Sequence, residues 1–354
     1  MRAFAESGFY RGRSIFVTGH TGFKGAWLAT WLKMLGARVS GFALPPEEPS
    51  LFEAGRVGEG MESTFADLRN LNDLEAALRA AQPEIVFHLA AQALVRRSYH
   101  DPIGTFATNV MGTAHLLDAV RRVPSVRAVL VVTSDKCYEN REWPHAYREP
   151  DPMGGRDPYS SSKGCAELVT AAYRASFFEG GAAIATARAG NVIGGGDWAE
   201  DRIVPDLIRG LTRDEVIPIR APHAIRPWQH VLEPLNGYLV LGQRLLEAPA
   251  TASEGWNFGP AESSSVPVQA LAEAVVQEWG GGRLELATTP PGLHEATFLA
   301  LDWGKARLRL GWQPRLDFGR TVALTVQWYR DFHRDPTSGK RLTEAQIEQY
   351  DRSV

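Results

Sequence analysis

The sequence predicts an α/β fold: a doubly wound parallel sheet with a smaller C-terminal domain. Two observations lead to this prediction. Short apolar runs rich in β-branched residues recur through the first 190 residues, with helical stretches between them, and a glycine-rich turn joins the first run to the first helical stretch. Strands that alternate with helices form parallel βαβ units, and near-continuous apolar strands suit a sheet covered on both faces.

The expected elements alternate along the chain. The predicted strands are 14–18, 37–42, 85–89, 128–132 and 183–187, and the predicted helices are 26–32, 74–81 and 109–121. Beyond Gly190 the pattern is less regular, with Gly- and Pro-rich stretches such as Gly194-Gly195-Gly196-Asp197. We therefore expect a first domain over 1–190 and a mainly substrate-binding domain over 191–354, with the segment 229–258 returning to the sheet.

The composition is that of an ordinary soluble globular protein. Of the 354 residues 44% are apolar and 22% are charged, and the formal net charge is −3. The arginines are scattered, which argues against a nucleic-acid-binding surface. No apolar run is long enough to span a bilayer and the N-terminus lacks a signal peptide's apolar centre, so we expect a cytoplasmic protein. Cys137 and Cys165 fit neither a CxxC motif nor zinc spacing, so we expect two reduced thiols and no metal.

The glycine-rich turn is typical of a dinucleotide site. Gly19, Gly22 and Gly25 fall at i, i+3 and i+6, between the first predicted strand and the first predicted helix. Without a Cβ, Gly19 and Gly22 would let a pyrophosphate approach the N–H groups at the helix N-terminus, and Gly25 would let the helix pack closely. The triplet is also compatible with a plain tight turn. Its place in the first βαβ unit favours a Rossmann-type dinucleotide-binding domain.

The acidic residue that usually binds the ribose hydroxyls is missing. It is expected about 20 residues after the glycine turn, where this chain has Gly41-Phe42-Ala43-Leu44. No arginine stands there either, which disfavours NADP but does not settle the choice between NAD and NADP. Asp67 and Leu68 are candidates to hold the adenine, although Asp67 also fits a plain helix N-cap.

Tyr159 and Lys163 form a candidate catalytic pair. Their spacing of four places both side chains on one face of a helix, and Pro158 suits the start of that helix. A lysine beside a tyrosine stabilises the phenolate and lowers the phenol pKa, which makes a usable general base near neutral pH. The same spacing also occurs in surface pairs. Together with the glycine turn, it predicts proton transfer coupled to hydride chemistry on a dinucleotide.

A polar triplet directly follows the strand 128–132. Ser134, Asp135 and Lys136 would lie at the carboxyl edge of the sheet, where ligands bind in open α/β folds. These residues can supply a hydroxyl, an acid and a base. The alternative is a strand-end turn with an Asp–Lys ion pair, which contributes little to stability. The residues alone leave both interpretations open.

These motifs together resemble the extended short-chain dehydrogenase/reductase family over nearly the whole chain. The segments that carry the resemblance are 18–25, His88-Leu89-Ala90-Ala91-Gln92, Asn109-Val110-Met111-Gly112-Thr113, the Tyr159–Lys163 pair and Arg188-Ala189-Gly190-Asn191-Val192. Within this family the chain is most similar to the 4,6-dehydratases of CDP-sugars, through segments 20–25, 49–53, 133–138 and 226–234. The dehydratases of dTDP- and GDP-sugars usually have Asp-Glu where this chain has Asp135-Lys136. The non-acidic second strand also agrees with the CDP-sugar group.

The resemblance implies NAD as the cofactor and a CDP-sugar as the substrate. The residues it assigns to NAD are Gly19, Gly22, Phe23, Lys24, Gly25, Asp67, Leu68, Leu89, Ala90, Ala91, Asn109, Tyr159 and Lys163. The residues it assigns to the substrate are Gln92, Ser134, Asn191, Arg202 and Arg226. A guanidinium suits a diphosphate because its donors form a planar fork, although both arginines also fit solvated surface positions. The family further implies a homodimer formed through helices of the cofactor domain.

The implied reaction is a dehydration with an internal redox cycle. Tyr159, tuned by Lys163, takes the proton of the sugar 4-hydroxyl while hydride passes from carbon 4 to NAD. Lys136 is the candidate base for the carbon-5 proton, and Asp135 is the candidate acid for the departing 6-hydroxyl. Hydride then returns to carbon 6, and Ser134 orients the 4-oxygen. The expected product is a CDP-4-keto-6-deoxy sugar.

Two other interpretations stay open. A sugar-nucleotide epimerase or decarboxylase shares the glycine turn and the Tyr–Lys pair, but it leaves Asp135 and Lys136 without a role. A non-catalytic NAD-binding sensor belongs to a different functional class. That interpretation predicts loss of the Tyr–Lys pair or of the polar triplet, and the sequence retains both.

Overall fold

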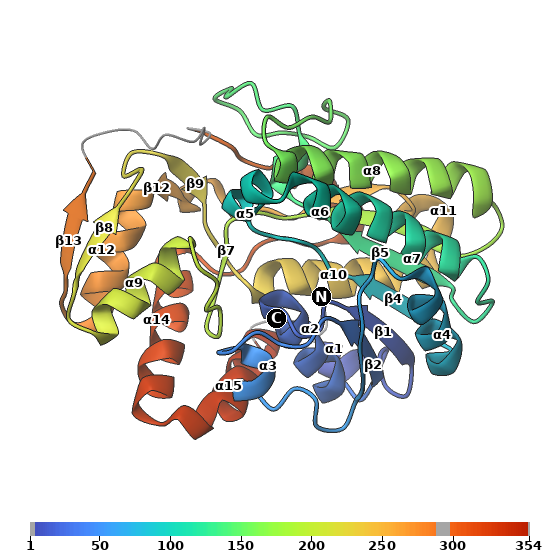
Figure 1. The fold of residues 1–354 in the computed structure, drawn as a ribbon, viewed down its shortest axis with the longest axis horizontal. Coiled ribbons are helices and arrows are strands. Elements are labelled where there is room, and N and C mark those ends of the chain that lie inside the picture. Colours follow the sequence, from blue (N-terminus) through green and yellow to red (C-terminus); the bar gives the residue numbers. More distant parts are fainter. Residues whose placement is uncertain (1–3, 288–297, 353–354) are drawn as a thin grey trace.

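A seven-stranded parallel sheet forms the centre of the molecule (Figure 1). The computed structural model describes residues 4–287 and 298–352. The strand order is β11-β6-β5-β4-β1-β2-β3, and every neighbouring pair is parallel. The strands are β1 (Ser14–Thr18), β2 (Arg38–Ala43), β3 (Glu62–Phe65), β4 (Ile85–His88), β5 (Ala128–Val132), β6 (Ala183–Arg188) and β11 (Gly255–Asn257). The carboxyl ends of all these strands therefore meet at one edge of the sheet.

Helices cover both faces of this sheet because its strands are apolar on both sides. On β1, Ile15 and Val17 point into one hydrophobic layer and Phe16 points into the other. The first layer includes α2 (Phe23–Met34) and α10 (Leu232–Glu247), and the second includes α4 (Leu71–Ala81), α7 (Gly112–Val120) and α8 (Pro158–Phe177). This arrangement confirms the predicted doubly wound fold.

Short elements connect the strands in the first half of the chain. They are α1 (Phe4–Ser7), α3 (Leu51–Ala54), α5 (Val95–His100), α6 (Pro102–Phe106), the π-helical turn η1 (Ala107–Met111) and the 3₁₀ turn η2 (Asp135–Cys137). The predicted helix 109–121 therefore consists of part of η1 followed by α7. A π turn interrupts regular helical pairing and is often found at functional sites.

The C-terminal half adds three two-stranded sheets, with pairs β10–β7, β12–β9 and β13–β8. The elements are β7 (Val192–Ile193), α9 (Ile203–Thr212), β8 (Val216–Ile219), β9 (Ile225–Pro227), β10 (Gln229–His230), α11 (Pro249–Ala252), η3 (Glu262–Ser264), β12 (Ser265–Pro267), α12 (Val268–Trp279), β13 (Arg283–Leu286), α13 (Gly304–Leu310), α14 (Phe318–Arg334), η4 (Pro336–Ser338) and α15 (Gly339–Arg352). Within the segment 229–258, β11 pairs with β6 of the main sheet, whereas β10 pairs with β7 in a sheet of its own.

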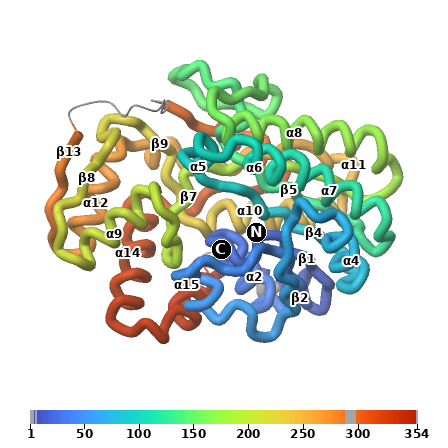
Figure 2. Tube along the Cα trace, in the orientation of Figure 1, coloured from blue at the N-terminus to red at the C-terminus, as the bar shows by residue number. Residues whose placement is uncertain are grey.

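The edge strand β3 was not delimited by the sequence, for a physical reason. Its residues are Glu-Ser-Thr-Phe, and most of them are exposed. An edge strand of this kind presents neither an apolar run nor a clean alternation. The first and last described helices, by contrast, are joined, since the Phe4 N–H of α1 donates to the Asp351 carboxylate of α15 at 3.1 Å. The labels N and C accordingly lie close together in the tube of Figure 2.

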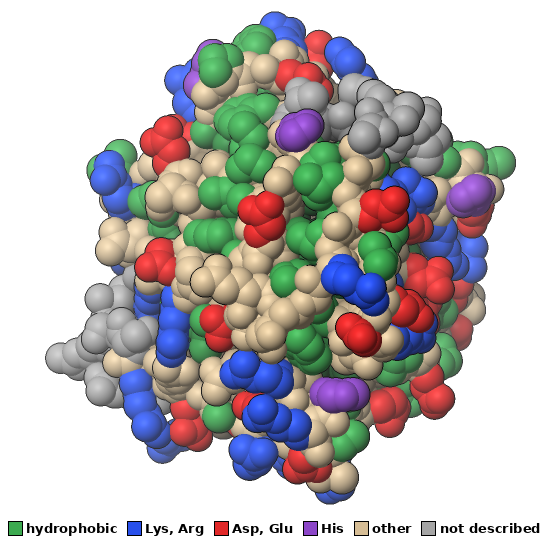
Figure 3. Space-filling view, turned by 90° about the vertical axis from the view of Figure 1, so that its left-hand side faces the viewer, with side chains coloured by type: hydrophobic (Ala, Val, Ile, Leu, Met, Phe, Trp, Pro, Cys, Tyr) green, Lys and Arg blue, Asp and Glu red, His purple; other side chains and the backbone are tan. Residues whose placement is uncertain are grey.

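On the face of the molecule shown in Figure 3, acidic and basic side chains are interspersed, so neither sign of charge dominates it. Among the described helices, none is both long and apolar enough to cross a membrane. Cys137 is buried and Cys165 is half-buried, and both are free thiols. Within the described ranges, no group of three or more His, Cys, Asp or Glu side chains is placed to hold a metal ion.

Candidate active site

The glycine turn joins β1 to α2, as predicted, but its three glycines have different tasks. A Cβ at Gly25 would overlap the Gly19 carbonyl oxygen, so this glycine allows the helix to pack on the turn. A Cβ at Gly22 would meet only the Gly19 oxygen, at 3.5 Å, which leaves open space before the helix N-terminus. Gly19 has a φ of +76°, and a Cβ would lie 2.6 Å from the Ala90 backbone nitrogen, so this glycine serves the turn conformation and close packing. Its place beside the pyrophosphate stays a prediction.

The space in front of Gly22 fits a dinucleotide. The first N–H groups of an α-helix lack partners within the helix and bind phosphate well, provided that no side chain blocks the approach. At α2 the N-cap residue Gly22 has no side chain and makes no capping hydrogen bond. The residues of the turn are therefore compatible with the pyrophosphate of NAD.

The candidate adenine residues lie after β3. Asp67 forms a hydrogen-bonded ion pair with Arg69, with 2.6 Å between Arg69 Nη2 and Asp67 Oδ2. The N-cap of α4 is Asn70, so the alternative interpretation of Asp67 as a helix cap is wrong. The Leu68 side chain is buried, and a Cβ at Gly112 would lie 2.6 Å from its Cδ2. The Leu68 side chain therefore packs against the start of α7, and its carbonyl oxygen lies 3.3 Å from His115 Nδ1 on the same helix.

The segment after β4 is tied to the glycine turn. The Leu89 and Ala90 N–H groups donate to the Thr18 carbonyl at 3.1 Å and to the Thr18 hydroxyl at 3.2 Å. Thr18 also bonds His88 Nδ1 at 2.7 Å. Burial, with a smaller effect of the Lys163 charge, lowers the pKa of His88 to about 3, so this ring is neutral. Ala91 follows in the same half-buried segment.

Gln92 and Asn109 are connected to each other rather than open to solvent. Asn109 Oδ1 accepts from the Gln92 N–H at 2.8 Å, and Asn109 Nδ2 donates to Ser162 on α8 at 2.8 Å. The Gln92 side chain donates to Leu94 and Thr105, both at 3.0 Å, and accepts from the Leu94 N–H. A substrate contact by the Gln92 amide would require these bonds to break. In the chain by itself Gln92 therefore braces this segment, and its contact with substrate stays a prediction.

The polar triplet lies in a buried turn at the carboxyl end of β5. Ser134 caps η2, since its Oγ accepts from the Lys136 N–H at 3.2 Å, and it donates to Asp135 Oδ1 at 2.9 Å. Asp135 is 1% exposed. The Lys136 side chain is half-buried, and among the described residues its ammonium group has no hydrogen bond or ion pair. The predicted Asp135–Lys136 ion pair, the alternative to a catalytic triplet, is therefore not formed.

Tyr159 and Lys163 lie on the first two turns of α8, which begins at Pro158 as predicted. Both are buried, and a hydrogen bond links the Tyr159 hydroxyl with Ser134. Burial raises the pKa of Tyr159 to about 12, against the opposing effect of the Ser134 hydrogen bond. Our expectation that Lys163 lowers this pKa is wrong for the chain by itself. Burial also lowers the pKa of Lys163 to about 8, and its ammonium donates to the Val132 carbonyl at 3.3 Å.

Two residues of the glycine turn point toward the second half of the protein. Phe23 packs against Gly194, whose Cβ would lie 3.3 Å from the Phe23 ring. The Lys24 ammonium lies 5.9 Å from the centre of the Tyr238 ring. Burial, together with the charges of Lys163 and Arg202, lowers the pKa of Lys24 to about 7. Lys24 therefore adjoins the candidate catalytic residues as well as the dinucleotide site.

The residues predicted to bind substrate come from the second half of the chain. Asn191 Nδ2 donates to Asp135 Oδ2 at 3.0 Å, so this amide holds the candidate acid. Arg202 precedes α9 and pairs with Asp197 at 2.8 Å, and its charge lowers the pKa of Tyr159. Arg226 is buried on β9 and donates to the Ile225 carbonyl at 2.9 Å. Neither arginine is a fully solvated surface residue, which was the alternative interpretation.

Sequence reasoning missed several residues that support this site. The Ser98 hydroxyl accepts from the Tyr159 N–H at 3.1 Å and so fixes the start of α8. The Tyr238 ring is fully buried below Lys24. Neither residue stands in a motif, so no pattern could have marked it. Glu167 was within reach of pattern analysis, because it continues the four-residue spacing from Tyr159 and Lys163.

The fold and the site together define an extended short-chain dehydrogenase/reductase. A doubly wound parallel sheet carries an open glycine turn, a buried Tyr–Lys pair and a polar strand-end turn, all at its carboxyl edge. The sequence profile of the family described as GDP-mannose 4,6 dehydratase matches residues 16–325. The chain belongs to this family.

Individual relatives narrow the comparison. The chain is 50% identical to the CDP-glucose 4,6-dehydratase of Salmonella typhimurium over 336 residues, which cover 93% of this chain and 94% of the relative. The structure of MoeE5 in complex with UDP-glucuronic acid and NAD is similar with a TM-score of 0.76 at 25% identity, covering 90% of this chain and 99% of MoeE5. The dTDP-glucose 4,6-dehydratase DesIV of Streptomyces venezuelae shares the fold, with a TM-score of 0.78 at 22% identity, covering 90% of this chain and 97% of DesIV.

Proposed function

We propose that the protein is a carbon–oxygen lyase that converts CDP-glucose into CDP-4-keto-6-deoxyglucose and water with NAD as a resident cofactor. The observation that carries the proposal is the meeting of the Ser134–Asp135–Lys136 turn with Tyr159 at the edge of the sheet that also holds the glycine turn. The 50% identity with the Salmonella CDP-glucose 4,6-dehydratase, over most of both chains, supports the choice of substrate.

The cofactor would be held by residues that the structure has already brought together. Gly22 and the N-terminus of α2 face the pyrophosphate, and the segment Leu89–Ala91 adjoins the same turn through Thr18. When bound there, NAD supplies a reversible two-electron acceptor for the sugar and a positive charge. The Tyr159 hydroxyl is protonated in the chain by itself, because its pKa is about 12. A cation placed near a buried phenol favours the phenolate, and Lys163 lies on the next turn of the same helix to assist.

The chain's own residues would then handle three protons. Tyr159 accepts the proton of the sugar 4-hydroxyl as that carbon is oxidised to a ketone, and Ser134 orients the oxygen. The ketone acidifies carbon 5, from which a deprotonated Lys136 removes a proton. Asp135, held by Ser134 and Asn191, gives a proton to the 6-hydroxyl, which leaves as water. Lys136 returns a proton to carbon 5 as carbon 6 is reduced, and the 4-oxygen remains a ketone. The proton on Tyr159 then passes through solvent to replace the one that Asp135 gave up, which restores the starting state of the site.

The nucleotide end of the substrate would be held by arginines. In the sequence Arg202 precedes α9 and Arg226 follows β8. Arg202 is paired with Asp197, and Arg226 is buried. Guanidinium groups in such places bind diphosphates through paired donors. Arg202 would have to share its donors between Asp197 and the diphosphate.

The substrate proposal is tested by incubation with CDP-, dTDP-, GDP- and UDP-glucose in parallel. We expect loss of water and a 4-keto chromophore in alkali with CDP-glucose above all. Turnover of dTDP-glucose alone would overturn the substrate assignment. A product isomeric with the substrate would favour an epimerase. Lys136→Ala should retain bound NAD but abolish exchange of the carbon-5 hydrogen with solvent, and unchanged exchange would exclude Lys136 as the base.

We further propose that the protein acts as a homodimer through α7 and α8. Exposed hydrophobic side chains on and next to these helices support this arrangement: Met111 is 51% exposed, Leu168 is 60% exposed and Phe177 is 51% exposed. Contiguous apolar side chains at a surface mark interaction sites. Sedimentation equilibrium should give twice the chain mass, and Leu168→Glu should shift it toward the monomer. A monomeric parent protein would contradict this proposal.

A further inference from the structure

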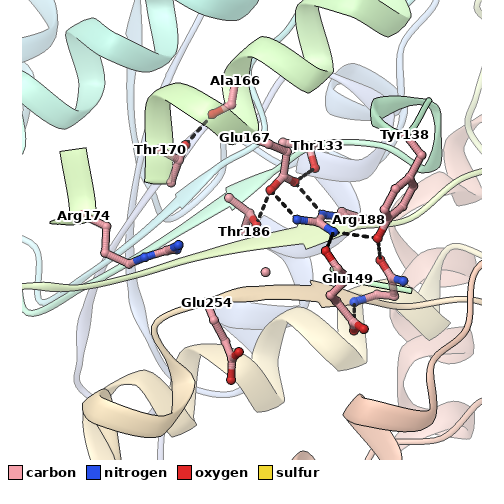
Figure 4. Close-up of polar contacts among 12 residues, drawn as sticks. Thr133, Tyr138, Glu149, Ala166, Glu167, Thr170, Arg174, Thr186, Arg188 and Glu254 are labelled. Atoms are coloured by element: carbon pink, nitrogen blue, oxygen red, sulfur yellow. Dashed lines mark hydrogen bonds and ion pairs between the residues drawn. The ribbon is translucent and has the colours of Figure 1, made fainter. Parts of the chain in front are cut away.

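A buried ion pair lies behind the catalytic turn. Glu167 on α8 and Arg188 at the end of β6 are 5% and 6% exposed, and Arg188 Nη2 lies 2.8 Å from Glu167 Oε2 (Figure 4). A second bond joins Arg188 Nε to Oε1 at 3.0 Å. Burial raises the pKa of Glu167, but the Arg188 charge and the surrounding hydrogen bonds outweigh it and hold the pKa below its usual value. The pair is therefore ionised at neutral pH.

The ion pair holds the residue that precedes the catalytic turn. The Thr133 hydroxyl donates to Glu167 Oε1 at 2.5 Å, and the Thr186 hydroxyl donates to Oε2 at 2.7 Å. Thr133 directly precedes Ser134, whereas Thr186 lies inside β6. Two hydroxyls and one guanidinium thus bind both oxygens of the carboxylate, which leaves little freedom for Glu167 to move.

The same ion pair holds the residue that follows the turn. Arg188 Nη1 donates to the Tyr138 hydroxyl at 2.6 Å, and Tyr138 donates in turn to Asn257 Oδ1 at 2.7 Å. Tyr138 directly follows η2. Figure 4 shows Thr133 and Tyr138 converging on the pair from different segments of the chain. The turn with its candidate acid and base is therefore anchored at both ends to one buried unit.

The helix that carries this unit also carries the reactive pair. Glu167 follows Lys163 by four residues and Tyr159 by eight, so the three share one face of α8. The Lys163 ammonium donates to Val132, the last residue of β5. The Glu167 charge raises the pKa of Lys163 against the larger, lowering effect of burial. Helix and strand end are thus joined at two successive turns of α8.

We infer that the Glu167–Arg188 pair is a positioning unit for catalysis, which sets the Ser134–Lys136 turn against Tyr159 through the flanking residues Thr133 and Tyr138. The inference rests on the proposed dehydration, because it presumes that the turn performs chemistry. A buried ion pair often adds little to stability compared with apolar packing, whereas reaction rates respond steeply to small errors in the position of reacting groups. The four residues act through others, and none of them is assigned to substrate or cofactor.

Two matched variants test this inference. Thr133→Val and Thr186→Val each remove one buried hydroxyl that donates to Glu167, and valine keeps the shape of the side chain. We expect Thr133→Val to lower kcat on CDP-glucose about tenfold with KM changed by less than about twofold, since the turn loses its anchor. Thr186→Val should lower the melting temperature to a similar degree but keep kcat within about twofold of the parent. Thr133→Ser should restore most of kcat.

Each outcome of this test is decisive. A difference in kcat between the two valine variants, with rescue by Thr133→Ser, supports the positioning role. Equal kcat in the two variants, whether unchanged or reduced, overturns it. Tyr138→Phe, which removes the anchor on the other side of the turn, replaces Thr133→Val if that variant does not fold, and it should also lower kcat. If the parent protein turns over no sugar nucleotide, the proposed function itself is wrong. If the parent is active and the two valine variants have equal kcat values, only the positioning inference is wrong.

Discussion

The first two turns and the middle of helix α8 present buried charged or polar groups in opposite situations. Burial pushes Tyr159 and Lys163, at the N-terminal end, toward their uncharged forms, with pKa values of about 12 and about 8. Glu167, two turns from Tyr159, stays charged because Arg188 and two hydroxyls bind it. Tyr159 and Lys163 have few partners that would fix their protonation states. Both oxygens of the Glu167 carboxylate, by contrast, accept hydrogen bonds from Arg188 and from a threonine hydroxyl. Groups that exchange protons need the first environment, and groups that fix geometry need the second.

Tyr159→Phe removes the proton-accepting hydroxyl in the first turn of α8 and should have the largest effect on activity. The substitution removes the proton acceptor for the sugar hydroxyl, so kcat should fall by about 10²- to 10⁴-fold. The free energy of unfolding should change by no more than about 1 kcal/mol, the usual net contribution of one hydrogen bond. Steady-state kinetics and urea unfolding measure the two quantities. A variant that keeps a tenth or more of the parent kcat would show that Tyr159 is not the acceptor.

Glu167→Gln breaks the buried ion pair and should have the largest effect on stability, with a loss of kcat because the pair also positions the catalytic turn. Glutamine keeps the shape but leaves the Arg188 charge buried without its counter-ion, which typically costs about 3–5 kcal/mol. Urea unfolding of the variant and the parent gives this difference directly. A loss below about 1 kcal/mol would mean that water or a neighbouring group compensates Arg188, and the contrast between the first two turns and the middle of α8 would not hold.

His230→Phe tests how the burial of a titratable side chain that has no ionic partner affects the pH dependence of stability. Burial lowers the pKa of His230 to about 3, whereas an unfolded histidine binds a proton near pH 6.5. Between these values the unfolded state holds more protons, so stability falls as the pH is lowered below 6.5. The phenylalanine variant should lose about 2 kcal/mol less than the parent between pH 7 and pH 5. His223→Phe, at an exposed position, is the control and should match the parent slope.

Glu348→Gln at the surface should have the smallest effect. Its partner Arg352 lies one helical turn away at 3.0 Å, but the two side chains are 53% and 79% exposed. Exposed pairs of this type contribute about 0.3–0.5 kcal/mol, and salt screens them. Unfolding at low and high ionic strength should separate this pair from the buried one. An effect as large as that of Glu167→Gln would show that exposure does not decide the outcome.

The sequence predicted the buried strands well because their signal is local. β1 and β5 coincide with the predicted 14–18 and 128–132, since β5 is apolar throughout, β1 is apolar at its three central residues, and turn residues follow both. β3 was not predicted, because an exposed edge strand has no such apolar run. The division of the predicted helix 109–121 into η1 and α7 was not predicted either. Asn109 bonds to Gln92 and Ser162, and these hydrogen bonds are formed only in the folded chain.

The candidate site was predicted in its residues but not in its electrostatics. The motifs placed Asp135, Tyr159 and Lys163 at one edge, and the structure brings them together. The pKa of Tyr159 could not be read from spacing, since burial depends on every segment that covers the hydroxyl. The close packing of Gly19 could not be read from spacing either, because its neighbour Ala90 comes from the distant strand end of β4.

The most direct test of the central claim, an internal redox cycle that removes water, follows one hydrogen atom. CDP-glucose with deuterium on carbon 4 is incubated with the protein and stoichiometric NAD, and the product is examined by NMR and mass spectrometry. The account predicts that the deuterium moves to carbon 6 of a 4-keto-6-deoxy product within the same molecule. Deuterium retained on carbon 4, or lost to the solvent, would contradict it.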